Sequence, residues 1–145
     1  PDVVFGADVI AGFPTESDQA HQASLDMIEA AGITHLHVFP YSPRLGTPAA
    51  AMPQLSREII KARARALRQF GRQRLEEFLD SAVGSTDQLL VEIGNRGHGR
   101  NFAKIRLDES SYPSGSLVDV HLVGRDGDSL VGRPQQGENK AYELV

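Results

Sequence analysis

The sequence has no cysteine and no tryptophan among its 145 residues. Without cysteine, the chain forms no disulfide, no CxxC zinc site and no iron–sulfur cluster held by its own thiolates. This absence fits a reducing compartment, and we expect a cytoplasmic protein. No apolar run approaches the ~18 residues that a membrane-spanning helix needs, so we expect no membrane partner.

Motifs of several enzyme classes are also absent. The chain has no Walker A, G-x-S-x-G or H-E-x-x-H pattern. His35 and His37 would face the same side of a strand, but no third ligand accompanies them. We therefore expect neither a metal site nor a catalytic residue in this chain.

Basic residues are scarce at the start of the chain. Residues 1–54 hold one basic residue, Arg44, against six acidic ones, whereas residues 55–84 hold seven basic and four acidic ones. The net charge of −4 therefore hides a basic middle segment. Five of its bases follow helical spacing: Arg57, Lys61, Arg65, Arg68 and Arg72. This basic stripe either contacts RNA phosphate, faces solvent, or pairs with the acidic first segment.

The pattern of residues 1–84 predicts an α/β architecture. A strand is expected over about 6–11, a helix over about 16–30 with Thr15 as its N-cap, and a second strand over 33–41. Strand–helix–strand in so short a span indicates a parallel pair. The proline-rich loop that follows, residues 42–54, should be extended rather than helical.

A long helix is expected over residues 57–82. Gly71 weakens its middle by ~1 kcal/mol relative to alanine, which allows a break there, and Gly84 should end it. Two parallel strands and two helices leave sheet edges and one sheet face uncovered. We therefore expect the chain to be a C-terminal fragment whose earlier strands are missing.

From residue 85 the apolar pattern changes from helical to alternating. The expected strands are short: around Leu89–Ile93, 102–107, 117–123 and 129–132. Residues 95–99 read as a turn-rich loop, and Arg125-Asp126-Gly127-Asp128 as a hairpin turn. This spacing favours a small antiparallel barrel or sandwich over 85–133, followed by a flexible tail at 134–145.

Three stretches, in order along the chain, carry a family resemblance. Residues 6–17 resemble a strand-to-helix corner of radical S-adenosylmethionine (SAM) enzymes. Residues 34–50, with the wording HLHVFPYS, resemble the last barrel strand and loop of the methylthiotransferases, closest to the branch acting on threonylcarbamoyladenosine in tRNA. Residues 97–102 resemble a stretch of that branch's TRAM domain, a small RNA-binding β-barrel, although Gly99-Arg100 stands where Thr-Glu is usual.

The resemblance implies a parent enzyme. It would add a methylthio group to C2 of the adenine in threonylcarbamoyladenosine of tRNA, with SAM and two 4Fe–4S clusters as cofactors. The family's cluster cysteines lie upstream, so the chain would need the N-terminal part of the same polypeptide and be inactive alone. The alternatives are a non-catalytic RNA-binding TRAM module, or a sister methylthiotransferase acting on isopentenyladenosine-tRNA or a ribosomal protein.

The resemblance also implies two sets of site residues. The SAM-facing wall would comprise Gly12, Phe13, Pro14, Glu16, Phe39, Tyr41 and Ser42. Parallel sheets bind ligands at the carboxyl ends of their strands, where an aromatic ring packs on an adenine. The RNA-binding set would comprise Arg96, His98, Arg100, Asn101, Phe102, Lys104 and Arg106. Basic side chains beside an aromatic ring are suited to binding looped RNA. An ordinary strand–helix turn and a solvated hairpin remain the alternatives.

Overall fold

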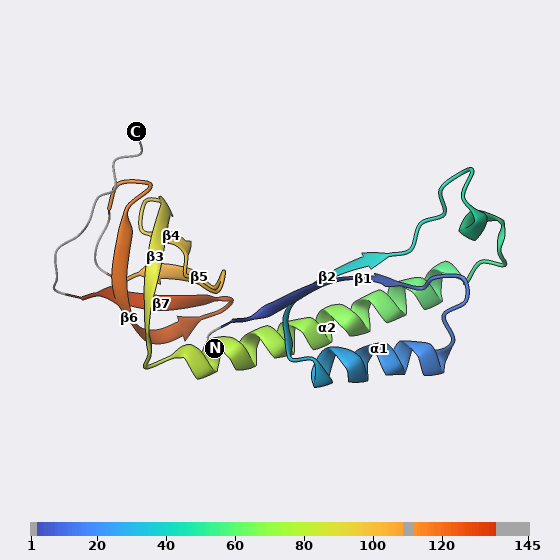
Figure 1. The fold of residues 1–145 in the computed structure, drawn as a ribbon, viewed down its shortest axis with the longest axis horizontal. Helices are drawn as coiled ribbons and strands as arrows, with labels where there is room; N and C mark the ends of the chain where they lie inside the picture. The colour runs from blue at the N-terminus through green and yellow to red at the C-terminus, as the bar shows by residue number, and fades with distance from the viewer. Residues whose placement is uncertain (1–2, 109–111, 136–145) are drawn as a thin grey trace. The chain divides into compact units, whose positions relative to one another are not determined.

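The computed structural model describes residues 3–108 and 112–135. They form two compact units, Val4–Leu75 and the residues from Glu76 onward (Figure 1). The elements in chain order are β1 (Phe5–Ala11), α1 (Asp18–Ala30), β2 (Ile33–Pro40), the 3₁₀ helix η1 (Pro48–Ala51), α2 (Arg57–Ala82), β3 (Thr86–Ile93), β4 (Arg96–His98), β5 (Lys104–Leu107), β6 (Leu117–Asp126) and β7 (Ser129–Pro134). The expected fold class, α/β followed by all-β, is confirmed. In the part of the chain that is described, no helix has the length and apolar character needed to cross a membrane.

In the first unit, β1 and β2 form the predicted parallel pair, with Asp8 opposite His37 and Ile10 opposite Phe39. Both helices lie on one side of this sheet (Figure 1). The core between sheet and helices centres on four buried residues, Ala11, Ile28, Ala64 and Leu67. On the opposite face, Ile10 is 56% exposed and Phe39 52% exposed. A sheet of two strands with one apolar face left open matches the end of a larger barrel.

Two local expectations in this unit are wrong. Helix α1 begins at Asp18 with Ser17 as its N-cap, because the backbone N–H of Glu16 bonds to the Phe13 carbonyl and makes a turn of the residues before it. The loop expected to be extended contains η1. Thr47 caps it and Pro48 occupies its first turn, where a missing N–H carries no penalty.

Helix α2 runs without a break through Gly71. A Cβ at this position would lie 3.0 Å from the Cβ of Leu36, so glycine lets β2 lie close against the helix. As predicted, the chain turns away at Gly84, which has a φ of +92°.

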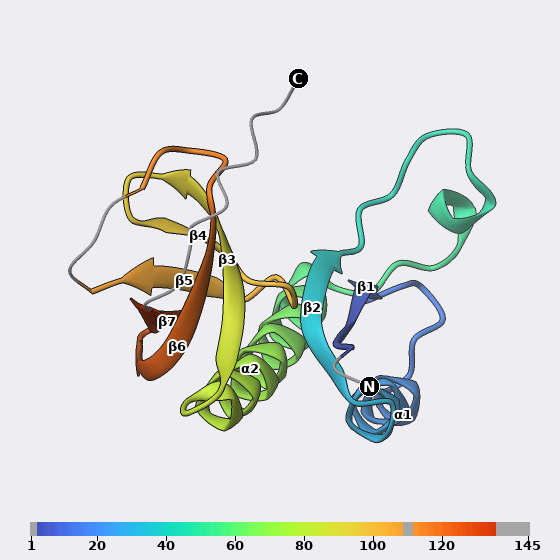
Figure 2. The same cartoon turned by 60° about the vertical axis from the view of Figure 1, so that its left-hand side comes forward.

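In the second unit, the strands close into a barrel in the order β3-β4-β5-β7-β6 (Figure 2). Every neighbouring pair is antiparallel except β5 and β7, which are parallel. Alternate residues fill the interior: Leu89, Val91, Ile105, Leu107, Val118, Val120, Leu122 and Leu130. Closure pairs all the strand edges of this unit.

The segment expected as a loop at residues 95–99 instead contains β4. Its pairing with β5 sets Arg96 opposite Arg106, and a Cβ at Gly97 would collide with the Leu90 carbonyl, so only glycine fits. Pro134 ends β7, and the backbone N–H of Gln135 donates to the Asp119 carbonyl. The rest of the expected tail, 136–145, lies outside the described residues.

Candidate functional site

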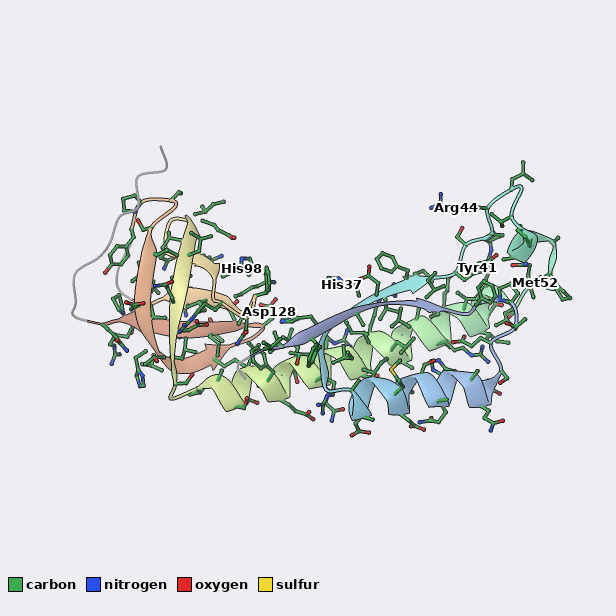
Figure 3. All side chains as sticks on the ribbon, in the orientation of Figure 1. His37, Tyr41, Arg44, Met52, His98 and Asp128 are labelled. Atoms are coloured by element: carbon green, nitrogen blue, oxygen red, sulfur yellow. The ribbon has the colours of Figure 1, made fainter. Side chains whose placement is uncertain are left out.

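A pocket of about 620 Å³ lies in the first unit, at the carboxyl ends of β1 and β2. Phe39, Tyr41 and Ser42 line it, and these are three of the seven residues expected in the SAM-facing wall. Ile10 and Arg44 line it as well (Figure 3 shows Tyr41 and Arg44 after β2). The pocket therefore combines apolar and aromatic walls with a cation, and it opens on the uncovered side of the sheet.

The other four expected residues of the wall, Gly12, Phe13, Pro14 and Glu16, do not line this pocket. The Phe13 ring meets the Tyr41 ring edge to face, with centroids 5.4 Å apart. Gly12 has a φ of +80°, and a Cβ there would lie 2.6 Å from Cγ1 of Ile60 in α2. In this structure Gly12 thus allows the close approach of α2, and Phe13 packs against Tyr41, a residue that lines the pocket.

Glu16 holds the corner after β1 together with Arg63, which the sequence analysis did not single out. The Glu16 carboxylate accepts the backbone N–H of Gly12 at 2.7 Å and Nη1 of Arg63 at 2.9 Å. Nη2 of Arg63 donates to Asp18 at 2.6 Å. The hydrogen bond to Asp18, and after it the one to Glu16, raises the pKa of the Arg63 guanidinium, although burial opposes this. The side chains of Arg63 and Glu16 are only 9% and 11% exposed, so their contact is shielded from solvent, whereas the Asp18 side chain is fully exposed.

The pocket fits a nucleoside. The Tyr41 hydroxyl is buried and has no hydrogen-bond partner among the described residues, so its hydrogen-bonding capacity is not used within the part of the chain that is described. Phe39 and Tyr41 supply apolar ring surface suited to an adenine. An iron–sulfur cluster does not fit, because the chain has no thiolate to hold one. Over residues 3–108 and 112–135, no three His, Asp or Glu side chains gather as a metal site would require.

A second cavity, of about 340 Å³, lies on the barrel of the second unit. Arg96, His98, Lys104 and Arg106 line it, which are four of the seven expected RNA-binding residues. The antiparallel pairing of β4 with β5 brings them together, since Arg96 faces Arg106 and His98 faces Lys104. We call these four residues the basic cavity residues.

Three acidic residues that the sequence analysis missed share this cavity. Asp128 Oδ2 lies 2.6 Å from Lys104 Nζ. Asp126 Oδ2 lies 3.3 Å from Arg106 Nη2. Glu92 Oε1 lies 2.9 Å from Nδ1 of His98. The hydrogen bond from Lys104 lowers the pKa of Asp128 below its ordinary value. The hairpin turn at 125–128 was recognisable in the sequence, but its position beside Lys104 depends on the parallel β5–β7 pairing.

The remaining expected RNA-binding residues, Arg100, Asn101 and Phe102, lie in the tight turn before β5 and do not line the cavity. The Phe102 N–H donates to the Gly99 carbonyl at 3.0 Å, and Arg100 Nε donates to Asp87 at 3.1 Å. Phe102 has a φ of +58° and is 76% exposed. A bulky residue in the left-handed region is rare and costs about 1–3 kcal/mol. The turn therefore presents an aromatic ring to solvent at the cost of backbone strain.

All five residues of the basic stripe are exposed on α2. Nη2 of Arg68 donates to the Val38 carbonyl at 3.1 Å. Arg63, which does form ion pairs with the acidic first segment, lies outside the stripe. The stripe is thus available to solvent along most of its length.

Comparison with known proteins decides the family. No protein-family model matches the chain. The threonylcarbamoyladenosine tRNA methylthiotransferase MtaB of Rickettsia prowazekii is 45% identical over 124 residues, which are 86% of this chain and 29% of that protein. This chain is a relative of the tRNA methylthiotransferases. The expected family resemblance is confirmed.

Two further relatives carry the name tRNA-2-methylthio-N(6)-dimethylallyladenosine synthase. The one from Magnetococcus marinus is 38% identical over 132 residues, covering 86% of this chain and 27% of that protein. The one from Aeromonas salmonicida is 31% identical over 148 residues, covering 97% of this chain and 31% of that protein. The chain therefore spans about three tenths of the length of the methylthiotransferases that it matches.

Proposed function

We propose that this chain is the C-terminal part of a radical SAM tRNA methylthiotransferase. Its first unit would complete the catalytic barrel, and its second unit would hold tRNA. The 45% identity to a tRNA methylthiotransferase carries the proposal. The open apolar face of the β1–β2 sheet supports it, because a free-standing domain would cover that face. A tRNA substrate also favours a cytoplasmic location.

The reaction we propose for the whole enzyme is the addition of a methylthio group to C2 of adenine in threonylcarbamoyladenosine. The relative that bears this specificity in its name is 45% identical, against 38% and 31% for the two dimethylallyladenosine synthases. A sister enzyme acting on isopentenyladenosine-tRNA is the second candidate, because those two relatives match 86% and 97% of the chain.

In the first unit, the pocket residues would hold SAM. When bound, SAM supplies the radical source and the methyl group of the reaction. Phe39 and Tyr41 would pack against the adenine, and the Tyr41 hydroxyl and Ser42 would hydrogen-bond to the nucleoside. The packing of Phe13 on Tyr41 would fix the orientation of that ring. The N-terminal part of the enzyme would supply the cysteines of both 4Fe–4S clusters.

In the second unit, the basic cavity residues and Phe102 would hold RNA. Lysine and arginine contact phosphate as point charges or as bidentate forks. Stacking of a base on an exposed aromatic ring contributes about 1–3 kcal/mol. A barrel that only binds RNA, without a part in catalysis, is the alternative that this unit supports by itself.

RNA binding is tested with the 145-residue chain and a fluorescein-labelled anticodon stem-loop RNA, by fluorescence anisotropy. We expect affinity to fall with salt, with a log–log slope of about −0.7 to −0.9 for each phosphate contact. The variant Lys104→Gln should bind more weakly and reduce the slope by about one contact. Absence of binding at low salt, or binding that does not depend on salt, would contradict the RNA-holding role.

The choice between the two branches needs a chimera. In it, this chain replaces the matched segment of the Rickettsia relative, and tRNA nucleosides from cells that lack the endogenous enzyme are measured by mass spectrometry. We expect methylthio-threonylcarbamoyladenosine, and a loss of product in the chimera carrying Tyr41→Ala. Methylthio product on isopentenyladenosine alone would assign the chain to the sister branch.

A further inference from the structure

The charge balance of the barrel cavity is unusual for a phosphate-binding site. Three permanent cations line it, Arg96, Lys104 and Arg106, but so do the carboxylates of Glu92, Asp126 and Asp128. A cavity neutralised in this way attracts a polyanion far less than its count of bases alone indicates. The carboxylates therefore bear directly on how RNA would bind there.

The two acidic residues of the β6–β7 hairpin form ion pairs with two basic residues of β5. Asp128 holds Lys104 at 2.6 Å, and Asp126 holds Arg106 at 3.3 Å. Lys104 and Arg106 are two residues apart on one strand, so their side chains leave the same face about 6.7 Å apart. This separation is comparable to the step between neighbouring phosphates of a nucleic-acid strand.

Three of the four side chains in these two ion pairs are well exposed, and that of Arg106 is 31% exposed. The side chains of Lys104 and Asp128 are 58% and 64% exposed, and that of Asp126 is 72% exposed. Exposed ion pairs contribute little to stability, so an incoming phosphate can replace them at little cost. Arg96, by contrast, forms no ion pair with any residue that the structure describes, and its charge is available from the start.

We propose that Asp126 and Asp128 are intramolecular competitors of RNA phosphate, which occupy Lys104 and Arg106 until two adjacent phosphates displace them together. This inference rests on the proposed RNA-holding function and adds to it a pair of specificity-determining residues. Arg96 makes the first contact, and the hairpin carboxylates are then exchanged for the RNA backbone. A ligand with a single phosphate replaces only one of the two pairs, so the cavity discriminates in favour of an ordered strand.

The test compares single charge removals within one barrel. Asp128→Asn and Asp126→Asn remove a competing carboxylate at nearly constant shape. The matched control is Asp119→Asn, because Asp119 is an exposed carboxylate of β6 that bonds Gln88 and does not line the cavity. All three variants change the net charge equally, so a difference between them reports position rather than total charge. Circular dichroism and thermal melting confirm that each variant is folded.

The readout is binding of the labelled anticodon stem-loop RNA to the 145-residue chain across a series of salt concentrations. We expect each hairpin variant to bind about fivefold more tightly at low salt, the ratio set by one unit charge about 4 Å away in water. Asp119→Asn should change affinity less than twofold.

The outcomes separate this inference from the function on which it rests. If wild-type protein binds RNA with the expected salt dependence but the hairpin variants behave like Asp119→Asn, the competitor role is wrong and the RNA-holding function stands. If the wild type and the variants all fail to bind at low salt, both are wrong. Tighter binding by both hairpin variants, and by them alone, supports both.

Discussion

Replacing Arg63 by methionine removes the cation that joins α2 to the corner after β1. The guanidinium donates to the Glu16 carbonyl at 2.6 Å, to the Glu16 carboxylate at 2.9 Å and to Asp18 at 2.6 Å. Methionine has a similar length and keeps the apolar packing of the arginine stem. The substitution therefore tests the charge and its hydrogen bonds more than the volume of the side chain.

The expected cost follows from what the substitution leaves behind. The Glu16 side chain is 11% exposed, and in the variant its carboxylate keeps the Gly12 N–H but loses its strongest partner. Removing one member of a buried ion pair costs about 3–5 kcal/mol. The Asp18 arm adds little, because that side chain is fully exposed and such pairs contribute about 0–1 kcal/mol. We expect the free energy of unfolding of the first unit to fall by about 3 kcal/mol.

Urea unfolding followed by circular dichroism at 222 nm measures this loss, because both long helices lie wholly or largely in the first unit. Asp18→Asn should lose less than 1 kcal/mol. The double variant Arg63→Met, Glu16→Gln should lose less than Arg63→Met alone, since it leaves no unpaired carboxylate. If a variant has already lost its helical signal in buffer without urea, the substitution has lowered the free energy of unfolding by more than the stability of the wild-type unit. The reasoning is refuted if Arg63→Met costs below 1 kcal/mol, or if the double variant costs the sum of its single changes.

Three further outcomes follow from the same structure. Gly12→Ala should lose more than 2 kcal/mol in urea unfolding, because a left-handed alanine costs about 1–2 kcal/mol and contact with Ile60 adds about 1–3; the control Gly32→Ala, at φ +64° with open space around it, should lose only the first amount. Phe102→Ala should weaken binding of the stem-loop RNA by about 1–3 kcal/mol in anisotropy titrations, whereas Val123→Ala, exposed on β6, should leave it unchanged. The 145-residue chain alone, after iron–sulfur reconstitution, should yield no methylthio nucleoside by mass spectrometry, and any such product would contradict the assignment of the cluster ligands to a missing part of the enzyme.

Local sequence patterns were sufficient for most of the elements. The 3–4 spacing of apolar residues along 57–82 predicted α2, and the alternation from Leu89 to Ile93 predicted β3. Short or glycine-rich elements were missed, because three residues such as Arg96–His98 carry too little periodicity to be told from a loop. The N-cap of α1 was placed two residues early, because Thr15 and Ser17 are both suitable caps and only the turn at Glu16 distinguishes them.

The candidate sites depended more on contacts between distant residues. Phe39, Tyr41 and Ser42 were found from their place at the end of a strand, and the structure gathers them around one pocket. Arg63 was not found, since a residue on a helix gives no sign that it will meet a carboxylate 47 positions earlier. Asp126 and Asp128 were seen only as turn residues for the same reason.

By itself, the sequence determined the order of an α/β part followed by an all-β part, the family resemblance and the absence of iron–sulfur cluster ligands. These depend on local periodicity, on the residues of short motifs and on composition. Only the tertiary structure decided which charges meet. The parallel pairing of β5 with β7 places the hairpin carboxylates beside the basic cavity residues. The packing of α2 on the corner after β1 brings Arg63 to Glu16. Such contacts join residues that lie far apart in the sequence, and no pattern of neighbouring residues encodes them.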